Sequence, residues 1–397
     1  MAIGGLERAC DVANVSDIVE LAKALEDKYV VPAEARCVVV RNRNGKCRRC
    51  VDACINEAIK VWNNKIEMSP FACVGCGSCI AVCPTEALVP INPLDEEFAA
   101  QVAVATSNAG VTVISCARAA AWGYADPTKY ASVPCLGRMG ETMLLELAAR
   151  GVEQVCLVDG DCTTCKYGAA SENLEATLDS ACNLLWLFGS DMEVERMSDF
   201  PEVAMHASER EALAASRRGF FSTAGGKAKD VAMTAAEKTV SDALNMGKAQ
   251  KLASLRDRLG IAKGAGGKLP HFPSLRNERI LNALYELGEC EDETLTTRLF
   301  GRIEIDAEKC NGCGMCTMFC PTAAIRKSEE EHSEEGRQWM EFSAADCVQC
   351  GLCADACLKK CITLSKEVPV EELFSFEPRL IEASIPPKKG SILGRKR

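Results

Sequence analysis

The sequence has few of the side chains that usually carry acid–base chemistry. Its 397 residues include three histidines, His206, His271 and His332, none near another or near a cysteine-rich stretch. This scarcity argues against a histidine-rich metal site or a histidine acid–base pair, so we predict no catalytic residues. Aromatic residues make up 5% of the chain, as expected for small modules whose folding free energy comes largely from metal–thiolate bonds.

Targeting and nucleotide-binding signals are missing too. No run of about 18 or more uninterrupted apolar residues occurs, and the N-terminus lacks a charged segment followed by an apolar one. We therefore expect neither membrane insertion nor a secretory signal. No G-x-G-x-x-G pattern opens a helix after a strand, which argues against a flavin or nicotinamide site. The net charge of −10 argues against binding to nucleic acid.

Cysteine, by contrast, is abundant, with 25 in the chain. The C-terminal region contains the spacing C-x2-C-x2-C-x3-C twice, and thiolates at this spacing hold three corners of an iron–sulfur cubane while the partner run supplies the fourth. Zinc would leave the third cysteine of each run unused. We therefore predict two [4Fe-4S] clusters, one held by Cys310, Cys313, Cys316 and Cys357 and the other by Cys347, Cys350, Cys353 and Cys320. Cys361 is a competing candidate for the place of Cys357, which keeps the regular spacing.

The N-terminal region repeats this arrangement with one irregular arm. A regular motif would place a cysteine at position 44, but Asn44 stands there, and Cys37 is the nearest earlier cysteine. The alternative for Cys37 is a buried apolar thiol at the start of a strand. We predict two further [4Fe-4S] clusters, one held by Cys37, Cys47, Cys50 and Cys83 and the other by Cys73, Cys76, Cys79 and Cys54.

Both regions resemble bacterial two-cluster ferredoxins, over about residues 33–92 and 300–366. The resemblance implies that each half-module is a strand, a ligand loop and a short helix. Alternating apolar residues predict strands at Arg302–Ile305 and at 339–342, just before the two C-terminal runs, and a closing strand at 362–364.

The residues between the two modules show a different pattern. Strand-like and helical segments alternate, which predicts a small parallel sheet covered by helices. The expected strands are at 111–115, 131–134, 155–158 and 192–197, and the expected helices at 140–150 and 170–188. Cys116, Cys135, Cys162 and Cys165 each follow a strand, and so should meet at the sheet edge where ligands collect. Cys156 lies inside its strand and should belong to the core.

Residues 133–138, 145–151 and 156–168 resemble the delta subunit of methyl-viologen-reducing hydrogenase, which passes electrons between a hydrogenase and heterodisulfide reductase. The resemblance covers about residues 110–170 and implies a [2Fe-2S] cluster held by Cys116, Cys135, Cys162 and Cys165. That family usually has a paired cysteine motif at the first position, whereas this chain has Ser115-Cys116. The alternative is a thioredoxin-like redox dithiol at Cys162 and Cys165.

The remaining segments carry no predicted ligands. We expect an N-terminal helix and a helical linker that is either an interdomain tether or a partner-binding arm. The linker should contain surface helices within 226–260, a glycine-rich loop at 264–267 and a helix at 275–288. The predicted fold is a mixed α+β and α/β multidomain protein. Its parts are a helix (1–32), a dicluster module (33–94), an α/β domain (95–198), a linker (199–299), a second dicluster module (300–366) and a tail (367–397).

These features predict an iron–sulfur electron-transfer subunit of a cytoplasmic oxidoreductase complex, of hydrogenase, heterodisulfide reductase or formate dehydrogenase type. Isolated clusters transfer single electrons and need a neighbouring cofactor for other chemistry. We therefore expect a hetero-oligomer with flavin-, nickel- or molybdenum-bearing subunits, associated with a membrane at most through such partners. Two alternatives remain: a disulfide or thiol reductase that uses Cys162 and Cys165, and a redox sensor or cluster carrier.

Overall fold

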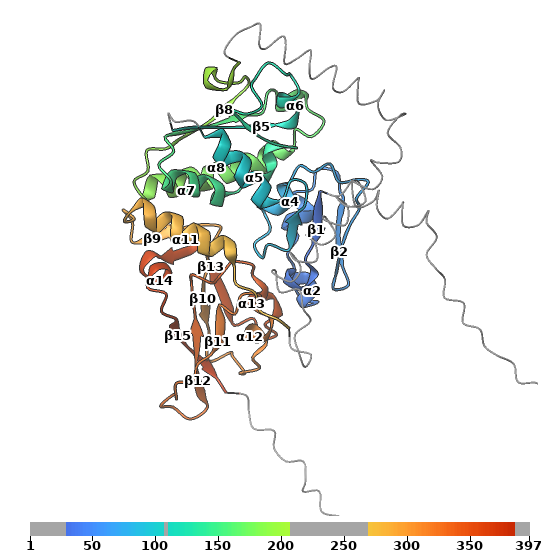
Figure 1. Cartoon of the computed structure of the whole chain (residues 1–397). Coiled ribbons are helices and arrows are strands. Elements are labelled where there is room, and N and C mark those ends of the chain that lie inside the picture. The colour runs from blue at the N-terminus through green and yellow to red at the C-terminus, as the bar shows by residue number, and fades with distance from the viewer. Residues whose placement is uncertain (1–28, 107–109, 207–268, 386–397) are drawn as a thin grey trace, which may run out of the picture.

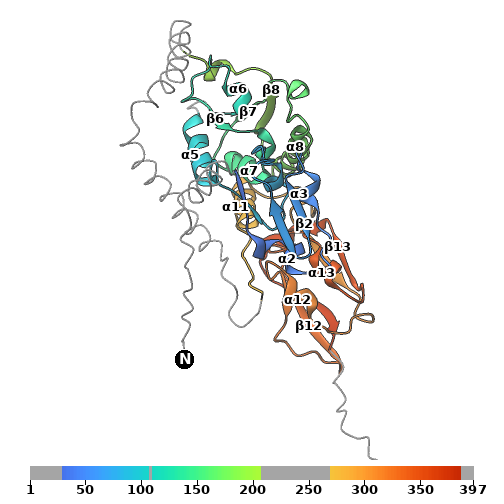
Figure 2. The same cartoon turned by 90° about the vertical axis from the view of Figure 1, so that its right-hand side faces the viewer.

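The computed structural model describes residues 29–106, 110–206 and 269–385. Its elements form an elongated body in which the central parallel sheet and the C-terminal module occupy opposite ends, while the N-terminal module lies beside both (Figure 1). Figure 2 shows the same arrangement from the side. The expected helices within 226–260 and the loop at 264–267 lie outside the described residues. Among the helices that the structure describes, none has the length and apolarity needed to cross a lipid bilayer.

The central sheet confirms the predicted parallel arrangement. Its four strands have the order β6-β5-β7-β8 and all pair in parallel. Val113, Ile114 and Leu157 are fully buried, as expected for inner strands of a parallel sheet that is covered on both faces. The strands are β5 (Val111–Cys116), β6 (Ala131–Val133), β7 (Gln154–Val158) and β8 (Glu193–Met197).

Helices α5 (Asp95–Ala105), α7 (Glu141–Ala149) and α8 (Ala170–Leu187) lie below this sheet in Figure 1. The expected helices at 140–150 and 170–188 are thus confirmed. Each helix presents an apolar face at helical spacing to the core. In α7 this face is formed by Leu144, Leu145 and Leu147, and in α8 by Leu174, Ala181, Leu184 and Leu185.

The N-terminal module has a small core of its own around Ile59, Ile66 and Leu88. Its sheets are antiparallel pairs: β1 (Val30–Pro32) with β4 (Leu88–Pro90), and β2 (Ile59–Trp62) with β3 (Lys65–Met68). Short helices lie between the strands: α2 (Val38–Arg41), α3 (Arg49–Asp52) and α4 (Ser78–Ala81).

Two sequence-based expectations are wrong in this region. The helix expected at 1–32 does not extend over its last residues, because Val30–Pro32 pairs with β4 as a strand. The strand considered after Cys37 is the helix α2, in which the amide of Arg41 donates to the carbonyl of Cys37 at 2.9 Å. The valines of this segment therefore serve one helical turn rather than a strand.

The C-terminal module confirms the three expected strands. β10 (Arg302–Ile305) pairs with β13 (Ile362–Ser365), and β12 (Arg337–Phe342) pairs with β11 (Ile325–Lys327). Helices α12 (Met315–Phe319) and α13 (Leu352–Ala356) complete the half-modules. The tail expected from residue 367 is wrong up to residue 385. It forms β14 (Glu367–Pro369), α14 (Val370–Phe374) and β15 (Arg379–Ser384), and β15 pairs with β12 along six residues.

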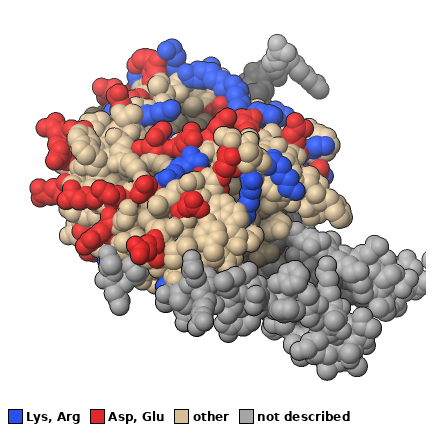
Figure 3. Space-filling view, turned by 90° about the horizontal axis from the view of Figure 1, so that it is seen from above, with Lys and Arg blue, Asp and Glu red and all other residues tan. Residues whose placement is uncertain are grey.

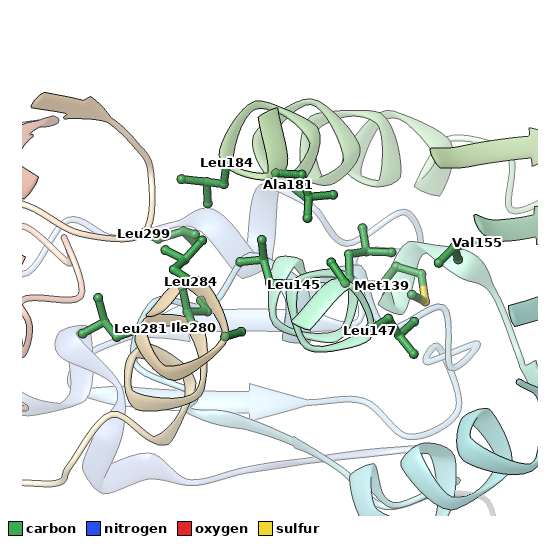
Figure 4. Close-up of a cluster of buried hydrophobic side chains, with 14 of the residues drawn as sticks. Met139, Leu145, Leu147, Val155, Ala181, Leu184, Ile280, Leu281, Leu284 and Leu299 are labelled. Atoms are coloured by element: carbon green, nitrogen blue, oxygen red, sulfur yellow. The ribbon is translucent and has the colours of Figure 1, made fainter. Parts of the chain in front are cut away.

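Helix α11 (Leu275–Leu287) confirms the helix expected at 275–288, but it is part of the core rather than a free tether. Ile280, Leu281 and Leu284 are buried between α7 and the C-terminal module (Figure 4). An ion pair between Arg279 and Glu146 of α7, 2.6 Å from Nε to Oε1, fixes the helix on its exposed side. β9 (Thr294–Thr296) then pairs with β14, so the central sheet and the C-terminal module share one continuous core.

Replacing Leu284 by alanine should loosen this shared core. Leu284 is fully buried, so its truncation should reduce the free energy of unfolding by about 2–5 kcal/mol through lost burial and a cavity. The matched control is Leu275→Ala in the same helix, whose side chain is 46% exposed. Thermal unfolding followed by circular dichroism should show a lower midpoint for Leu284→Ala alone. Equal midpoints for the two variants would contradict the shared core.

Candidate iron–sulfur sites

The structure brings each predicted quartet of thiols in the two modules together around a cavity. We number these groups by their place in space. Site 1 comprises Cys310, Cys313, Cys316 and Cys357. Site 2 comprises Cys320, Cys347, Cys350 and Cys353. Site 3 comprises Cys37, Cys47, Cys50 and Cys83. Site 4 comprises Cys54, Cys73, Cys76 and Cys79.

The cavities at sites 2, 3 and 4 each have a volume of about 20 Å³, and that of site 1 about 40 Å³. Site 1 also contains the competing thiol that the sequence singles out, because Cys361 lines the same cavity. The Cys361 sulfur lies 3.4 Å from that of Cys357. Five thiols therefore surround site 1.

Backbone turns with positive φ recur at fixed positions in the cysteine-containing arms of sites 1 to 4. In all four arms the third residue after the last cysteine has a positive φ of 50–59°, an uncommon conformation for residues other than glycine. These residues are Glu57, Glu86, Ala323 and Lys360. Three of the four arms also have positive φ two and four residues after their first cysteine, at Gly75 and Gly77, Gly312 and Gly314, and Gln349 and Gly351. In the irregular arm, the helix α2 follows Cys37 in place of these turns.

Backbone amides point at several sulfurs. The amide of Ala58 lies 3.1 Å from the Cys54 sulfur, that of Ala87 3.2 Å from Cys83, and that of Gly312 3.4 Å from Cys310. Such N–H groups stabilise negative charge on thiolate sulfur and tune a bound cluster. Four thiols around a cavity with aligned amides therefore fit a thiolate-held cluster. Among the described residues, no group of three or more His, Cys, Asp or Glu is placed to hold a single metal ion.

Burial makes these thiols weak acids. Burial, with a smaller contribution from the nearby thiols of Cys83, Cys37 and Cys47, raises the pKa of Cys50 to about 12. Burial likewise raises the pKa of Cys316 to about 12. Since metal ligation requires thiolates, cluster insertion must release protons. Four thiols close together disfavour the thiolate form when no metal is bound. The same four thiols give an iron cluster its complete set of ligands.

The thiols of the central domain form a fifth group, site 5. Cys116 ends β5, Cys135 follows β6, and Cys162 begins the single turn η3 (Cys162–Thr164) after β7. Burial and the nearby thiols of Cys76, Cys116 and Cys162 together raise the pKa of Cys135 to about 12. The amide of Cys165 donates to the Cys162 carbonyl at 3.2 Å, so the backbone of Cys165 closes the turn that begins at Cys162. Cys156 is 1% exposed inside β7, as expected for a core residue.

A charged pair lies beside Cys162. Its sulfur is 3.6 Å from Oδ2 of Asp159, which also accepts from Nε of Arg196 at 2.9 Å. Burial and Asp159 raise the pKa of Cys162 to about 11 against the opposing effect of Arg196. No sequence motif indicates these two residues. Asp159 directly follows β7, and Arg196 lies on the neighbouring strand β8, so only the strand order brings them together.

The five sites follow one another in space in an order that differs from the order along the chain. Each step is marked by a thiol of one site that raises the pKa of a thiol in the next. Cys316 raises the pKa of Cys353 (sites 1 and 2), Cys47 that of Cys350 (sites 3 and 2), Cys50 that of Cys79 (sites 3 and 4) and Cys76 that of Cys135 (sites 4 and 5).

The step from site 4 to site 5 depends on close backbone packing. Gly77, directly after Cys76, has φ of 79° and faces the 3-10 helix η2 (Leu136–Arg138), directly after Cys135. A Cβ on Gly77 would lie 2.8 Å from the Cα of Arg138. Arg138 is itself buried and donates to Oδ1 of Asp95 at 2.7 Å. Sequence reasoning missed Arg138, because an isolated arginine carries no spacing signal.

Comparison with known proteins supports the two modules. A family described as the 4Fe-4S dicluster domain matches residues 45–87 and 309–361. Proteins from Staphylococcus aureus strains USA300, NCTC 8325 and N315, each provisionally named as a formate dehydrogenase, are 35% identical over 60 residues. The alignment covers 12% of this chain and 6% of each relative, so the chain matches only a small part of those proteins. The chain therefore carries two 4Fe-4S dicluster domains, which are typical of electron-transfer proteins.

Substitution of Gly77 tests the contact between sites 4 and 5. Gly77→Ala should strain a left-handed position by about 1–2 kcal/mol and also push Arg138 away. Gly351→Ala is the matched control, since it has the same turn (φ 76°) and nothing within 4 Å of the added carbon. Hydrogen exchange of the amides in 135–140 should accelerate in Gly77→Ala and stay at the wild-type rate in Gly351→Ala. Equal exchange in both variants would show that the contact is absent.

Proposed function

We propose that this protein is an iron–sulfur electron-transfer subunit of an oxidoreductase complex, relaying single electrons between the redox centre of a partner and an acceptor. The observation that carries the proposal is the unbroken series of five thiol groups, in which each group has a thiol in electrostatic range of the next. A relay needs such closely spaced stations, whereas a storage or structural role does not.

In this proposal sites 1 to 4 each hold a [4Fe-4S] cluster and site 5 a [2Fe-2S] cluster. When bound, the clusters supply one-electron redox chemistry. The chain's own residues hold them through thiolates, direct amide N–H groups at the sulfurs and limit the access of water. The resemblance of residues 110–170 to the hydrogenase delta subunit favours the binuclear type at site 5. The modules and central domain would be the units predicted from the sequence, with residues 30–32 and 367–385 added to their neighbouring modules.

Exposure of the thiols supports electron entry or exit at the two ends of the series. Cys313 of site 1 is exposed, and Cys162 and Cys165 of site 5 are half-buried, whereas the middle site 3 has three buried thiols, Cys37, Cys50 and Cys83. Exchange with a partner requires a cluster near the surface, and internal relay does not. A series of sites that is accessible at both site 1 and site 5 suits a protein that lies between two other redox subunits.

The partners in this proposal are flavin-, nickel- or molybdenum-bearing subunits of a hydrogenase, heterodisulfide reductase or formate dehydrogenase in the cytoplasm. The provisional names of the relatives favour the formate dehydrogenase type. The net charge of −10 favours docking on basic partner surfaces. Seen from above, acidic side chains crowd the left edge of the molecule, although basic ones are interspersed elsewhere (Figure 3).

The alternative is a disulfide or thiol reductase acting through Cys162 and Cys165. Such a dithiol needs an accessible thiolate near neutral pH, whereas burial and Asp159 raise the pKa of Cys162 to about 11. The environment of Cys162 therefore favours the relay. Alkylation of the reduced protein separates the two functions, because a catalytic dithiol would be labelled at both cysteines without loss of iron. We expect these two cysteines to be labelled only after iron has been removed.

The amount of iron tests the proposal as a whole. Four cubanes and one binuclear cluster require about 18 irons and as many sulfides per chain. We expect this content in protein purified without oxygen, together with brown colour and reversible one-electron titration. Colourless protein, or protein loaded with zinc, would refute the proposed function.

The same measurement tests the irregular arm. Cys37→Ser should remove the cluster at site 3, about four irons per chain, and interrupt the series at its middle. Cys182→Ser is the control, since Cys182 is exposed and distant in sequence from every predicted ligand. Unchanged iron in Cys37→Ser would make Cys37 a structural thiol.

A further inference from the structure

The two dicluster domains meet at a buried arginine. Arg41, the last residue of α2, is 4% exposed and crosses from the N-terminal module to the C-terminal one. Its Nε donates to the carbonyl of Phe319 at 3.0 Å, and its Nη2 to the carbonyl of Cys320 at 3.3 Å. Its Nη1 donates to the carbonyls of Ala35 at 3.0 Å and Pro270 at 2.7 Å.

All of these partners are neutral carbonyls, which distinguishes Arg41 from the other buried arginines. Three arginines are buried among the residues that the structure describes. Arg36 pairs with Glu86 at 3.1 Å, and Arg138 pairs with Asp95 at 2.7 Å. Arg41 has no carboxylate partner in the described part of the chain. A buried charge without an opposite charge is strongly destabilising, so Arg41 needs an anion that the side chains of the described residues do not provide.

Two thiols of site 2, those of Cys320 and Cys350, lie within electrostatic range of this guanidinium. Burial lowers the pKa of Arg41, and the thiols of Cys320 and Cys350 oppose that change. The amide of Arg41 also donates to the carbonyl of Cys37, a thiol of site 3. Arg41 therefore lies between sites 2 and 3. Its backbone is one helical turn from Cys37, and its side chain donates a hydrogen bond to the carbonyl of Cys320.

We propose that the anion is the cluster of site 2 and that Arg41 raises its reduction potential. This inference rests on the proposed function. A [4Fe-4S] cluster with four thiolates carries net negative charge, which one-electron reduction increases. A fixed cation beside it favours the reduced form, and burial limits the screening of this attraction by solvent.

The junction has other contacts that should survive loss of this charge. The amide of Lys46 donates to Oδ2 of Asp355 at 2.9 Å, and Nη2 of Arg49 donates to the carbonyl of Gln349 at 3.0 Å. The ring of Phe272 lies 5.9 Å from the Arg41 guanidinium carbon. The contacts of Lys46 and Arg49 do not involve Arg41, so its replacement by the shorter, neutral glutamine should leave the two modules in contact.

The test is a redox titration of the full-length protein with bound clusters, followed by electron paramagnetic resonance. Arg41→Gln should lower the reduction potential of one of the four cubanes by about 59 mV. For a one-electron couple this shift is a tenfold change in the equilibrium constant for reduction. Arg41→Lys keeps the charge and should stay near the wild-type potential. Arg326→Gln is the control, because its pair with Glu341 lies on the surface of the same module.

An unchanged potential in Arg41→Gln with full iron content would overturn this inference and leave the proposed function intact. Wild-type protein that binds no iron would overturn both this inference and the proposed function. If Arg41→Gln loses iron, Arg41→Lys decides: full iron at the wild-type potential supports the counter-charge, and full iron at a lowered potential shows that hydrogen-bond geometry, not charge, sets it.

Discussion

The structure depends on the burial of many cysteine thiols close to one another. Crowded thiols with raised pKa values, such as Cys50 and Cys316, are poor ligands until metal displaces their protons. The chain meets this requirement locally, with left-handed turns that aim amides at the sulfurs. Charged side chains also act on several sites, among them Arg41 between sites 2 and 3, Arg49 and Asp355 near Cys47, and Asp159 and Arg196 beside Cys162.

The second determinant is the way in which the parts are joined. Helix α11 and strand β9 merge the central sheet and the C-terminal module into one core, while the N-terminal module is fixed to both by polar and backbone contacts. The residues after position 268 reach back to the N-terminal module as well: Arg276 donates to the carbonyl of Cys83 at 2.9 Å. These contacts define how the five sites are ordered.

Local features of this fold could be predicted because they repeat in the sequence. Cysteine spacing grouped the quartets of sites 1 to 4, and β-branched runs such as Val111–Ser115 indicated the parallel strands. Strand β15 could not be predicted, because its partner β12 already had a neighbour in β11 and nothing in Arg379–Ser384 demands pairing. The roles of Arg41 and Arg138 were equally invisible, since they depend on carbonyls and carboxylates brought near by folding. The order of the five sites in space could not be predicted either, because it depends on packing between residues far apart in the sequence.

The contact at Arg41 also has a consequence for biosynthesis. Its hydrogen bond to Phe319 joins residues 278 positions apart, so site 3 gains its neighbour only after the ribosome has translated the second dicluster domain. Until then Arg41 lacks the carbonyls of Phe319 and Cys320 on which its guanidinium rests. The first dicluster domain therefore completes this side of site 3 only after the second has been synthesised and has docked.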